Sequence, residues 1–220
     1  MLKITNVSAQ IAGITVLRNI DAEFTAGQLL AVVGRNGAGK TTLLRAIMGL
    51  LPLSAGTITF ESTDLSNVAA HSRAGLGLGY APEDRVMFPT FTVEENLRLP
   101  CEVLGLAKEE IDRRLARVLE VVPQLQEMLP RSGAALSGGQ GKMVALGRAL
   151  MVGSAIVLLD EPFQGLAPAL ALQYSEALGR LRTSRPDLSV VITESNSALL
   201  TDIPNQILTI ERGSFVEAIH

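Results

Sequence analysis

The chain has 220 residues and a formal net charge of −3, and 47% of its residues are hydrophobic. This length suits a single α/β domain, and apolar runs of only a handful of residues argue against a membrane-spanning helix, which needs about 20. Because no dense run of Lys or Arg is present, we expect no nucleic-acid partner, and the single cysteine, Cys101, cannot close an internal disulfide.

The predicted elements begin with β-strands and continue as alternating helices and strands. Period-two patterns and short continuous apolar runs predict strands, whereas apolar residues spaced three and four apart predict helices. In chain order the predictions are strands at 2–7, 14–24 and 29–33, a helix at 40–50, a strand at 57–60 after a turn at 54–56, helices at 109–122 and 139–151, a strand at 156–159, a helix at 169–182, a strand at 189–193 and a hairpin at 206–219 turning at Arg212 and Gly213. This order predicts an α/β core lobe at about 1–83 and 153–220 and a helical lobe at about 84–152.

A glycine-rich turn joins the predicted strand at 29–33 to the helix after it. Its sequence over 34–41, GRNGAGKT, fits the phosphate-binding pattern G-x-x-x-x-G-K-[ST]. Small residues let backbone N–H groups surround a phosphate, and the helix N-terminus adds a favourable dipole. We expect Lys40 to reach the β- and γ-phosphates of a nucleotide and Thr41 to offer its hydroxyl to Mg²⁺. The predicted contacts in this phosphate loop are Arg35, Asn36, Gly37, Ala38, Gly39, Lys40, Thr41 and Thr42.

Two adjacent acids follow the predicted strand at 156–159. Since the carboxyl ends of parallel strands face the ligand crevice, we expect Asp160 and Glu161 to lie there. Asp160 is predicted to hold Mg²⁺ through water, and Glu161 to orient and polarise an attacking water molecule. The alternative is that these are two solvated acids in a loop, and the presence of a phosphate loop in the same chain makes it less favoured.

The segment LSGGQ at 136–140 opens the predicted helix at 139–151. We expect Ser137 to cap this helix, whose N-terminus can meet an anion as the phosphate loop does. One chain does not need two anion-binding helix ends for one γ-phosphate, so the simplest account is two chains arranged head to tail. Each signature segment would then close on the nucleotide of the other chain. The predicted contacts are Ser137, Gly138, Gly139 and Gln140.

These three segments, in this order, make the chain resemble the ABC ATPase family over essentially its whole length. The resemblance implies an α/β fold with a P-loop NTPase core, an N-terminal antiparallel β region and a helical lobe that carries the signature. It also implies ATP and Mg²⁺ as cofactors and a second ABC ATPase subunit, identical or different, as dimer partner. Two transmembrane permease subunits would hold the pair on the cytoplasmic face of the plasma membrane, and a periplasmic or extracellular solute-binding protein would act indirectly.

Within that family the chain looks most like the second ATPase subunit of branched-chain amino-acid or urea uptake systems. The strings that carry this likeness are GRNG at 34–37, MGLLP at 48–52, GYAPE at 79–83, TVEENL at 92–97 and GLAP at 165–168. We therefore expect the ATP-hydrolysing motor of an importer. The motor of an exporter is the alternative, and a soluble ABC ATPase of DNA repair or translation is less favoured because no second ATPase domain or coiled coil is present.

In the importer reading, a groove near 83–96 receives a cytoplasmic helix of the permease. Asp84 and Arg85, followed by Phe88, Pro89 and Phe91, would supply mixed polar and aromatic contacts there. The competing interpretation is that these aromatic residues pack in the core.

Several positions depart from the usual family pattern. The place where an aromatic residue usually stacks on adenine falls on Ile11 or Gln10, so base selectivity is expected to be weak. Ile11 and Val16 are predicted to contact the nucleotide. Glu83 occupies the place of the usual Q-loop glutamine, and an ionised carboxylate only accepts hydrogen bonds, so we predict that it binds Mg²⁺ or water. Glutamate at this place also occurs in the amino-acid importer subgroup.

Ser195 stands where most members of the family carry a histidine that contacts the γ-phosphate. Serine can hydrogen-bond but cannot carry charge, so we assign Ser195 to the catalytic residues with the expectation of slow hydrolysis. A partner ATPase subunit would then supply the stronger site. Normal turnover, with Ser195 in a tolerant loop, is the alternative. Phe163 replaces a residue that is commonly small and polar, and the sequence offers no account of it beyond local packing.

Overall fold

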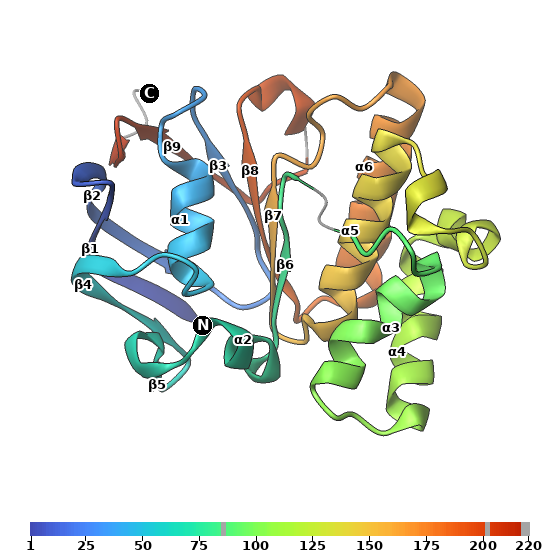
Figure 1. The fold of residues 1–220 in the computed structure, drawn as a ribbon. Helices are drawn as coiled ribbons and strands as arrows, with labels where there is room; N and C mark the ends of the chain where they lie inside the picture. The colour runs from blue at the N-terminus through green and yellow to red at the C-terminus, as the bar shows by residue number, and fades with distance from the viewer. Residues whose placement is uncertain (85–86, 201–202, 217–220) are drawn as a thin grey trace.

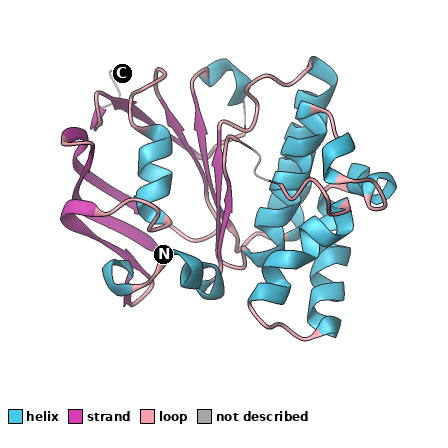
Figure 2. Ribbon diagram, in the orientation of Figure 1, coloured by secondary structure: helices cyan, strands magenta, loops and turns pink. Residues whose placement is uncertain are grey.

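The computed structural model describes residues 1–84, 87–200 and 203–216, which form two β-sheets and helices on both sides of the larger sheet (Figures 1 and 2). The strands are β1 Leu2–Ile11, β2 Ile14–Phe24, β3 Leu29–Val33, β4 Leu53–Phe60, β5 Thr63–Asp64, β6 Leu78–Ala81, β7 Ile156–Asp160, β8 Ser189–Glu194, β9 Gln206–Glu211 and β10 Ser214–Val216. The α-helices are α1 Lys40–Ile47, α2 Ala70–Arg73, α3 Val93–Val103, α4 Lys108–Val121, α5 Gly138–Val152 and α6 Pro168–Ser184. Short 3-10 helices cover Leu65–Asn67, Ala74–Leu76, Pro123–Met128, Gly133–Ala135 and Ser197–Leu200.

The larger sheet has six strands in the order β10-β9-β3-β8-β7-β6. All its pairings are parallel except that of β10 with β9. Helix α1 lies on one side of this sheet, and α3, α4, α5 and α6 lie on the other (Figure 1). Because both faces are covered, β3, β7 and β8 are buried along their whole length, which explains their nearly continuous apolar sequence.

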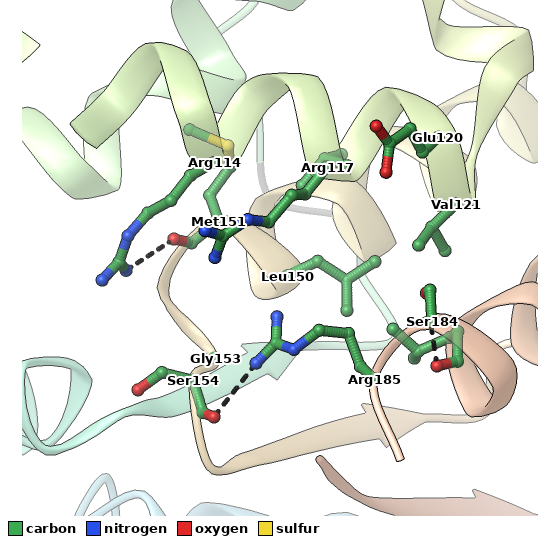
Figure 3. Close-up of a pocket in the computed structure, with 12 residues that line it drawn as sticks. Arg114, Arg117, Glu120, Val121, Leu150, Met151, Gly153, Ser154, Ser184 and Arg185 are labelled. Atoms are coloured by element: carbon green, nitrogen blue, oxygen red, sulfur yellow. Dashed lines mark hydrogen bonds between the residues drawn. The ribbon is translucent and has the colours of Figure 1, made fainter. Parts of the chain in front are cut away.

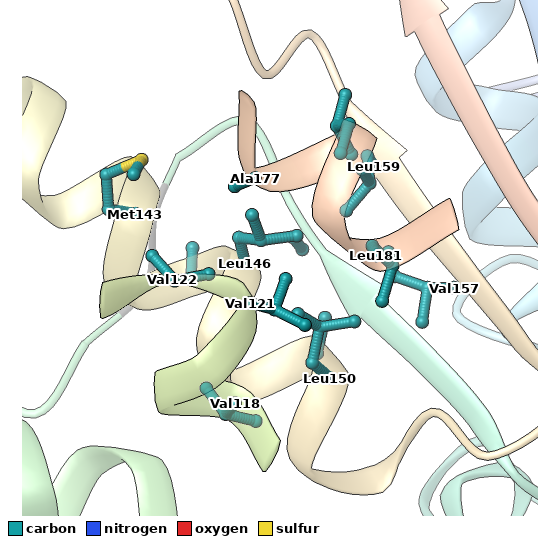
Figure 4. Close-up of a cluster of buried hydrophobic side chains, with 14 of the residues drawn as sticks. Val118, Val121, Val122, Met143, Leu146, Leu150, Val157, Leu159, Ala177 and Leu181 are labelled. Carbon is teal, nitrogen blue, oxygen red and sulfur yellow. The ribbon is translucent and has the colours of Figure 1, made fainter. Parts of the chain in front are cut away.

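Alternate residues of the central strands belong to two separate hydrophobic clusters. In β3, Leu30 and Val32 pack with α1 and the antiparallel sheet, whereas Ala31 and Val33 pack with the helices on the other face. Figure 4 shows the second cluster, in which Leu146 of α5 and Leu181 of α6 lie beside the apolar residues of α4 and β7. Two packed faces on one sheet hold its carboxyl edge in place, and that edge carries the candidate site.

The smaller sheet is antiparallel, in the order β2-β1-β4-β5, as the resemblance implied. Two predictions within it are wrong in extent. Strand β1 continues from Val7 to Ile11, and β4 begins at Leu53, so the predicted turn at 54–56 lies inside a strand. The reason is tertiary: Ala55 pairs with Ser8 of β1, and a register irregularity in β1 absorbs the local turn preference.

The short elements β5 and α2, the 3-10 helices, α3 and β6 were not predicted from the sequence. Helix α3 contains Pro100, which argues against a helix, yet a capping box between Thr92 and Glu95 starts it, and this Thr-x-x-Glu pattern is a sequence signal. Strand β6 has four residues, and among the described residues it pairs with β7 alone. The predicted C-terminal hairpin is present as β9 and β10, although its end at 217–219 lies outside the described residues. The division into two lobes stays a prediction.

Among the described residues, no helix combines the length and the apolar character that crossing a membrane requires.

Candidate nucleotide-binding site

The phosphate loop connects β3 to α1, as the motif requires. Gly39, the residue before the helix, has a φ of +115°, a conformation that residues with a side chain rarely adopt. A cavity of about 250 Å³ lies against the loop. The residues that line it are Val16, Asn36, Gly37, Gly39, Lys40, Thr41, Thr42, Glu83, Glu161 and Gln164. The structure therefore gathers residues from four separate segments of the chain at this cavity.

Lys40 is held inside this loop. Its side chain is buried, and Nζ donates to the carbonyl oxygens of Gly34 at 2.6 Å and Arg35 at 3.1 Å. It also forms an ion pair with Oε1 of Glu161 at 2.9 Å. A cation fixed beside backbone N–H groups at a helix N-terminus provides a binding place for phosphate oxygens.

Asp160 ends β7 within hydrogen-bonding distance of three hydroxyl groups. Thr193 donates to Oδ1 at 2.7 Å, Thr41 donates to Oδ1 at 3.1 Å, and Tyr80 donates to Oδ2 at 3.4 Å. Burial raises the pKa of Asp160, and these hydrogen bonds act in the opposite direction. The carboxylate is thus buried next to the hydroxyl of the phosphate loop, as the two motifs predicted separately.

The donor set at this edge fits Mg²⁺. A hydroxyl and a carboxylate are oxygen ligands of the kind that Mg²⁺ prefers, and the ion would offset the burial of a negative charge. The described residues contain no group of three or more His, Cys, Asp or Glu side chains that could hold a metal. This agrees with Mg²⁺ in nucleotide sites, which takes one or two protein ligands and completes its shell with phosphate oxygens and water. Glu83 lines the same cavity, and its binding of Mg²⁺ or water stays a prediction.

Glu161 has an unusual backbone with a φ of +47°. Its N–H donates to both the carbonyl and the hydroxyl oxygen of Thr193 at 3.1 Å, and its carbonyl accepts from Nζ of Lys142 in α5. Such a conformation in a residue with a side chain is costly and persists where the surroundings hold it, which is common at functional sites. Burial acts to raise the pKa of Glu161, but hydrogen bonds from Ser195 and Lys40 outweigh it, and the pKa lies below the usual value.

Ser195 follows β8 and contacts the site through its hydroxyl. Its Oγ accepts from Nζ of Lys40 at 3.1 Å and lies 2.6 Å from both Oδ1 of Asn36 and Oε1 of Glu161. A residue chosen only for its sequence position is therefore in direct contact with the phosphate loop and the acidic strand end.

Sequence reasoning missed Glu194. This side chain is only 1% exposed, and its Oε1 accepts from the backbone N–H of Phe163 at 2.8 Å. Burial raises the pKa of Glu194 to about 7, and the charge of Glu161 and a hydrogen bond to Glu161 contribute in the same direction. The sequence signal was that Glu194 is an acid at the end of an apolar run. Because the carboxyl ends of neighbouring parallel strands meet, an acid there can lie beside Asp160 and Glu161 at the end of β7.

The signature segment opens α5 but does not line the cavity at the phosphate loop. Ser137 caps the helix as predicted: its hydroxyl accepts from the N–H of Gln140 at 3.3 Å, and its own N–H donates to Oε1 of Gln140 at 3.1 Å. Gly139 packs so closely that an added Cβ would lie 2.3 Å from Cδ1 of Leu170. The capped helix end is therefore not part of the cavity at its own phosphate loop.

Of the two predicted contacts with the base, one lines the cavity and the other does not. Val16 lines the cavity, whereas Ile11 lies outside the lining, 45% exposed at the end of β1 opposite Ile14. Phe163 is buried and packs edge-on against Tyr174, with ring centroids 5.3 Å apart, which accounts for the aromatic residue there.

Phe88 and Phe91 are 43% and 36% exposed, and their ring centroids are 5.4 Å apart. Burial in the core therefore does not explain these aromatic residues. Arg148 of α5 lies over the Phe88 ring at 5.8 Å, which joins this loop to the signature helix. Arg85, predicted to contribute to the same surface, lies outside the described residues.

Comparison with known proteins agrees with this geometry. Residues 17–164 match the family model described as ABC transporter. The high-affinity branched-chain amino acid transport ATP-binding protein BraG of Pseudomonas aeruginosa is 32% identical over 216 residues, which cover 98% of this chain and 91% of that protein. The lipopolysaccharide export system ATP-binding protein LptB of Escherichia coli K12 is 31% identical over 87% of this chain and 78% of its own length.

Among solved structures, the ADP conformation of MJ1267, an ATP-binding cassette of an ABC transporter, superimposes with a TM-score of 0.82 at 25% identity. The match covers 98% of this chain and 89% of that one. The likeness therefore extends over the sheets and helices on both sides of the site.

Proposed function

The chain belongs to the ABC transporter family and is an ATP-binding, ATP-hydrolysing subunit, and from that premise we propose that it drives a membrane importer. The proposed solute is a branched-chain amino acid or a related small polar molecule such as urea. The observation that carries this proposal is the similarity to BraG over nearly the whole length of both proteins. The subgroup strings, among them GYAPE at 79–83 and GLAP at 165–168, support the same assignment.

The motor of an exporter is the second candidate, because LptB is similar at almost the same identity. The ATPase chemistry is common to both candidates, so it does not separate them. The separation depends on which permease and which solute stimulate ATP turnover.

The proposed hydrolysis uses the residues gathered at the carboxyl edge of the larger sheet. Lys40 and the N–H groups of the phosphate loop hold the β- and γ-phosphates. Thr41 and Asp160, with Glu83 as a further candidate, would hold Mg²⁺, which when bound neutralises charge on the phosphate oxygens. Glu161, whose low pKa keeps it ionised, accepts a hydrogen bond from water and takes up its proton as the water oxygen attacks the γ-phosphorus. The bond to the β-phosphate oxygen breaks, and ADP and phosphate leave.

We propose that two ATPase subunits act together, with the signature helix of one facing the phosphate loop of the other. The support is that α1 and α5 each present a helix N-terminus suited to an anion, and that the signature residues do not line the cavity of their own chain. Two permease subunits would complete the transporter and hold the ATPase pair at the inner membrane face. The exposed pair Phe88 and Phe91 offers them an aromatic contact.

Reconstitution tests the proposed function. The chain is combined in proteoliposomes with its permease subunits and their solute-binding protein, and phosphate release is measured with leucine, with urea and with no solute. We expect stimulation by leucine or urea together with accumulation of that solute inside. Stimulation that accompanies extraction of a lipid-linked molecule, with no response to either solute, would support the exporter instead.

A further inference from the structure

A second cavity, of about 360 Å³, lies on the helical side of the molecule and shares no lining residue with the nucleotide site. It is enclosed by the second half of α4, the C-terminal end of α5 and the C-terminal end of α6 (Figure 3). Its volume lies at the lower end of the range for small-molecule pockets.

Three arginines line this cavity. Arg114 and Arg117 come from α4, and Arg185 follows α6. Arg114 is already engaged, since it pairs with Glu110 and donates to the carbonyl oxygen of Met151 at 2.9 Å. Arg185 donates one hydrogen bond, to the carbonyl oxygen of Ser154 at 3.1 Å. Arg117 has no hydrogen bond or ion pair among the described residues.

The charges of these arginines act on one another. Burial lowers the pKa of Arg185, the positive charges of Arg117 and Arg114 lower it further, and only Asp187 acts in the opposite direction. Among the described residues that line the cavity, Glu120 is the one acid. Arg117 of α4 and Arg185, which follows α6, thus line one cavity (Figure 3), and their positive charges repel each other.

The rest of the wall is apolar. Val118 and Val121 of α4, Leu150 of α5 and Leu181 of α6 line the cavity and are at most 6% exposed. Cationic groups on one part of the wall and aliphatic groups on another favour a ligand with the same two parts.

We propose that this cavity binds a small organic anion, with its carboxylate or phosphate between Arg117 and Arg185 and a short aliphatic body against Leu150 and Leu181. A planar guanidinium matches two oxygens of such a group, and an anion between two cations removes their repulsion. Because the ligand contacts α4 and α6 together, its binding also stabilises the packing of these helices.

Methyl NMR of the full chain, labelled at Leu and Val, tests the site directly. The probes are 4-methylpentanoate, 4-methylpentan-1-ol, which has the same body without the charge, and inorganic phosphate, which has charge without the body. We expect saturable shifts of the Leu150 and Leu181 methyl signals with 4-methylpentanoate, at a Kd of about 1 mM or lower. The alcohol and phosphate are expected to bind at least about tenfold more weakly, since each lacks one part.

Arg117→Ala is the decisive variant, because Arg117 is exposed and holds no other residue in place. Its Kd for 4-methylpentanoate is expected to rise about tenfold, the loss of one charge-assisted contact. Arg113→Ala, which removes an exposed arginine of the same helix that does not line the cavity, is the matched control and keeps the parent Kd. Absence of saturable shifts up to about 20 mM, equal binding of the alcohol, or an unchanged Kd in Arg117→Ala overturns the proposal.

Discussion

Ser195 holds Glu161 through two contacts: its hydroxyl oxygen lies 2.6 Å from Oε1, and its backbone N–H donates to Oε2 at 3.1 Å. Lys40 donates to the same hydroxyl oxygen. The backbone contact does not depend on the side chain, so a substitution at Ser195 changes the charge and length of that side chain while Glu161 keeps the hydrogen bond from the backbone N–H.

The first prediction concerns the uncharged side chain at this position. Ser195→His should raise ATP turnover about tenfold, because a histidine can carry charge toward the γ-phosphate, and about 1.4 kcal/mol in the barrier gives that factor. Steady-state phosphate release at saturating Mg-ATP measures it, with Ser195→Ala as the control. If the parent protein already hydrolyses ATP rapidly and Ser195→His does not raise turnover, the prediction of slow hydrolysis at this site is wrong.

A second prediction separates binding from hydrolysis at Glu161. Glu161→Gln should lower turnover about 100-fold or more, since the amide cannot accept a proton from water, while nucleotide affinity stays within about threefold. With Mg-ATP bound and not consumed, the variant should form a stable dimer, which light scattering after size exclusion detects. Should it stay monomeric both alone and with its partner ATPase subunit, the proposed two-chain arrangement is wrong.

The third prediction follows from the buried Glu194. Its pKa of about 7 in the folded chain lies above the ordinary 4.5, so between these values the folded state binds more protons than the unfolded state. The stability that this group contributes is therefore complete below about pH 4.5 and is lost as pH rises through 7. The pKa of the neighbouring Glu161 is shifted downward, so it contributes in the opposite sense.

Glu194→Gln keeps the shape and removes the titration. At pH 8 we expect its Tm to exceed that of the parent by about 2–4 °C, which corresponds to about 1 kcal/mol. At pH 5, where Glu194 is protonated in the parent, the difference should be smaller. Thermal unfolding across pH 5 to 8 measures both, and parallel profiles for the two proteins would contradict the assignment.

A fourth prediction concerns stability away from the site. Arg73 is buried and donates to the carbonyl oxygens of Ala46, Ile47, Leu65 and Val68, which ties the end of α1 to the segment after β5. Arg73→Met should lower the free energy of unfolding by about 2–4 kcal/mol, because these carbonyls lose their donor. Urea unfolding measures the loss. Arg45→Met, an exposed change in α1, should cost less than about 0.5 kcal/mol, and an equal loss in both variants would refute the account.

Much of the fold could be predicted from local sequence. The extents of β2 and β3 agree with the prediction residue for residue, and α5 and α4 agree to within one residue at each end. In the helices the apolar residues recur with the helical period, and in β3 a continuous apolar run matches a strand that is buried on both faces. The extent of β4 could not be predicted in this way, because its first residues pair with a strand about 45 residues earlier, and such pairing overrides a local turn preference.

By itself the sequence determined the phosphate loop, the acidic strand end and the capped signature helix, because each depends on residues that are close together in the chain. Only the tertiary structure decided that Ser195 and Glu194 meet Glu161 and that Thr41 meets Asp160. These residues are far apart in the chain, and the parallel pairing of β8 with both β7 and β3, the strand before the phosphate loop, brings them together. The meeting of Arg117 and Arg185 across one cavity is likewise a property of how α4 packs against α6, which no local pattern encodes.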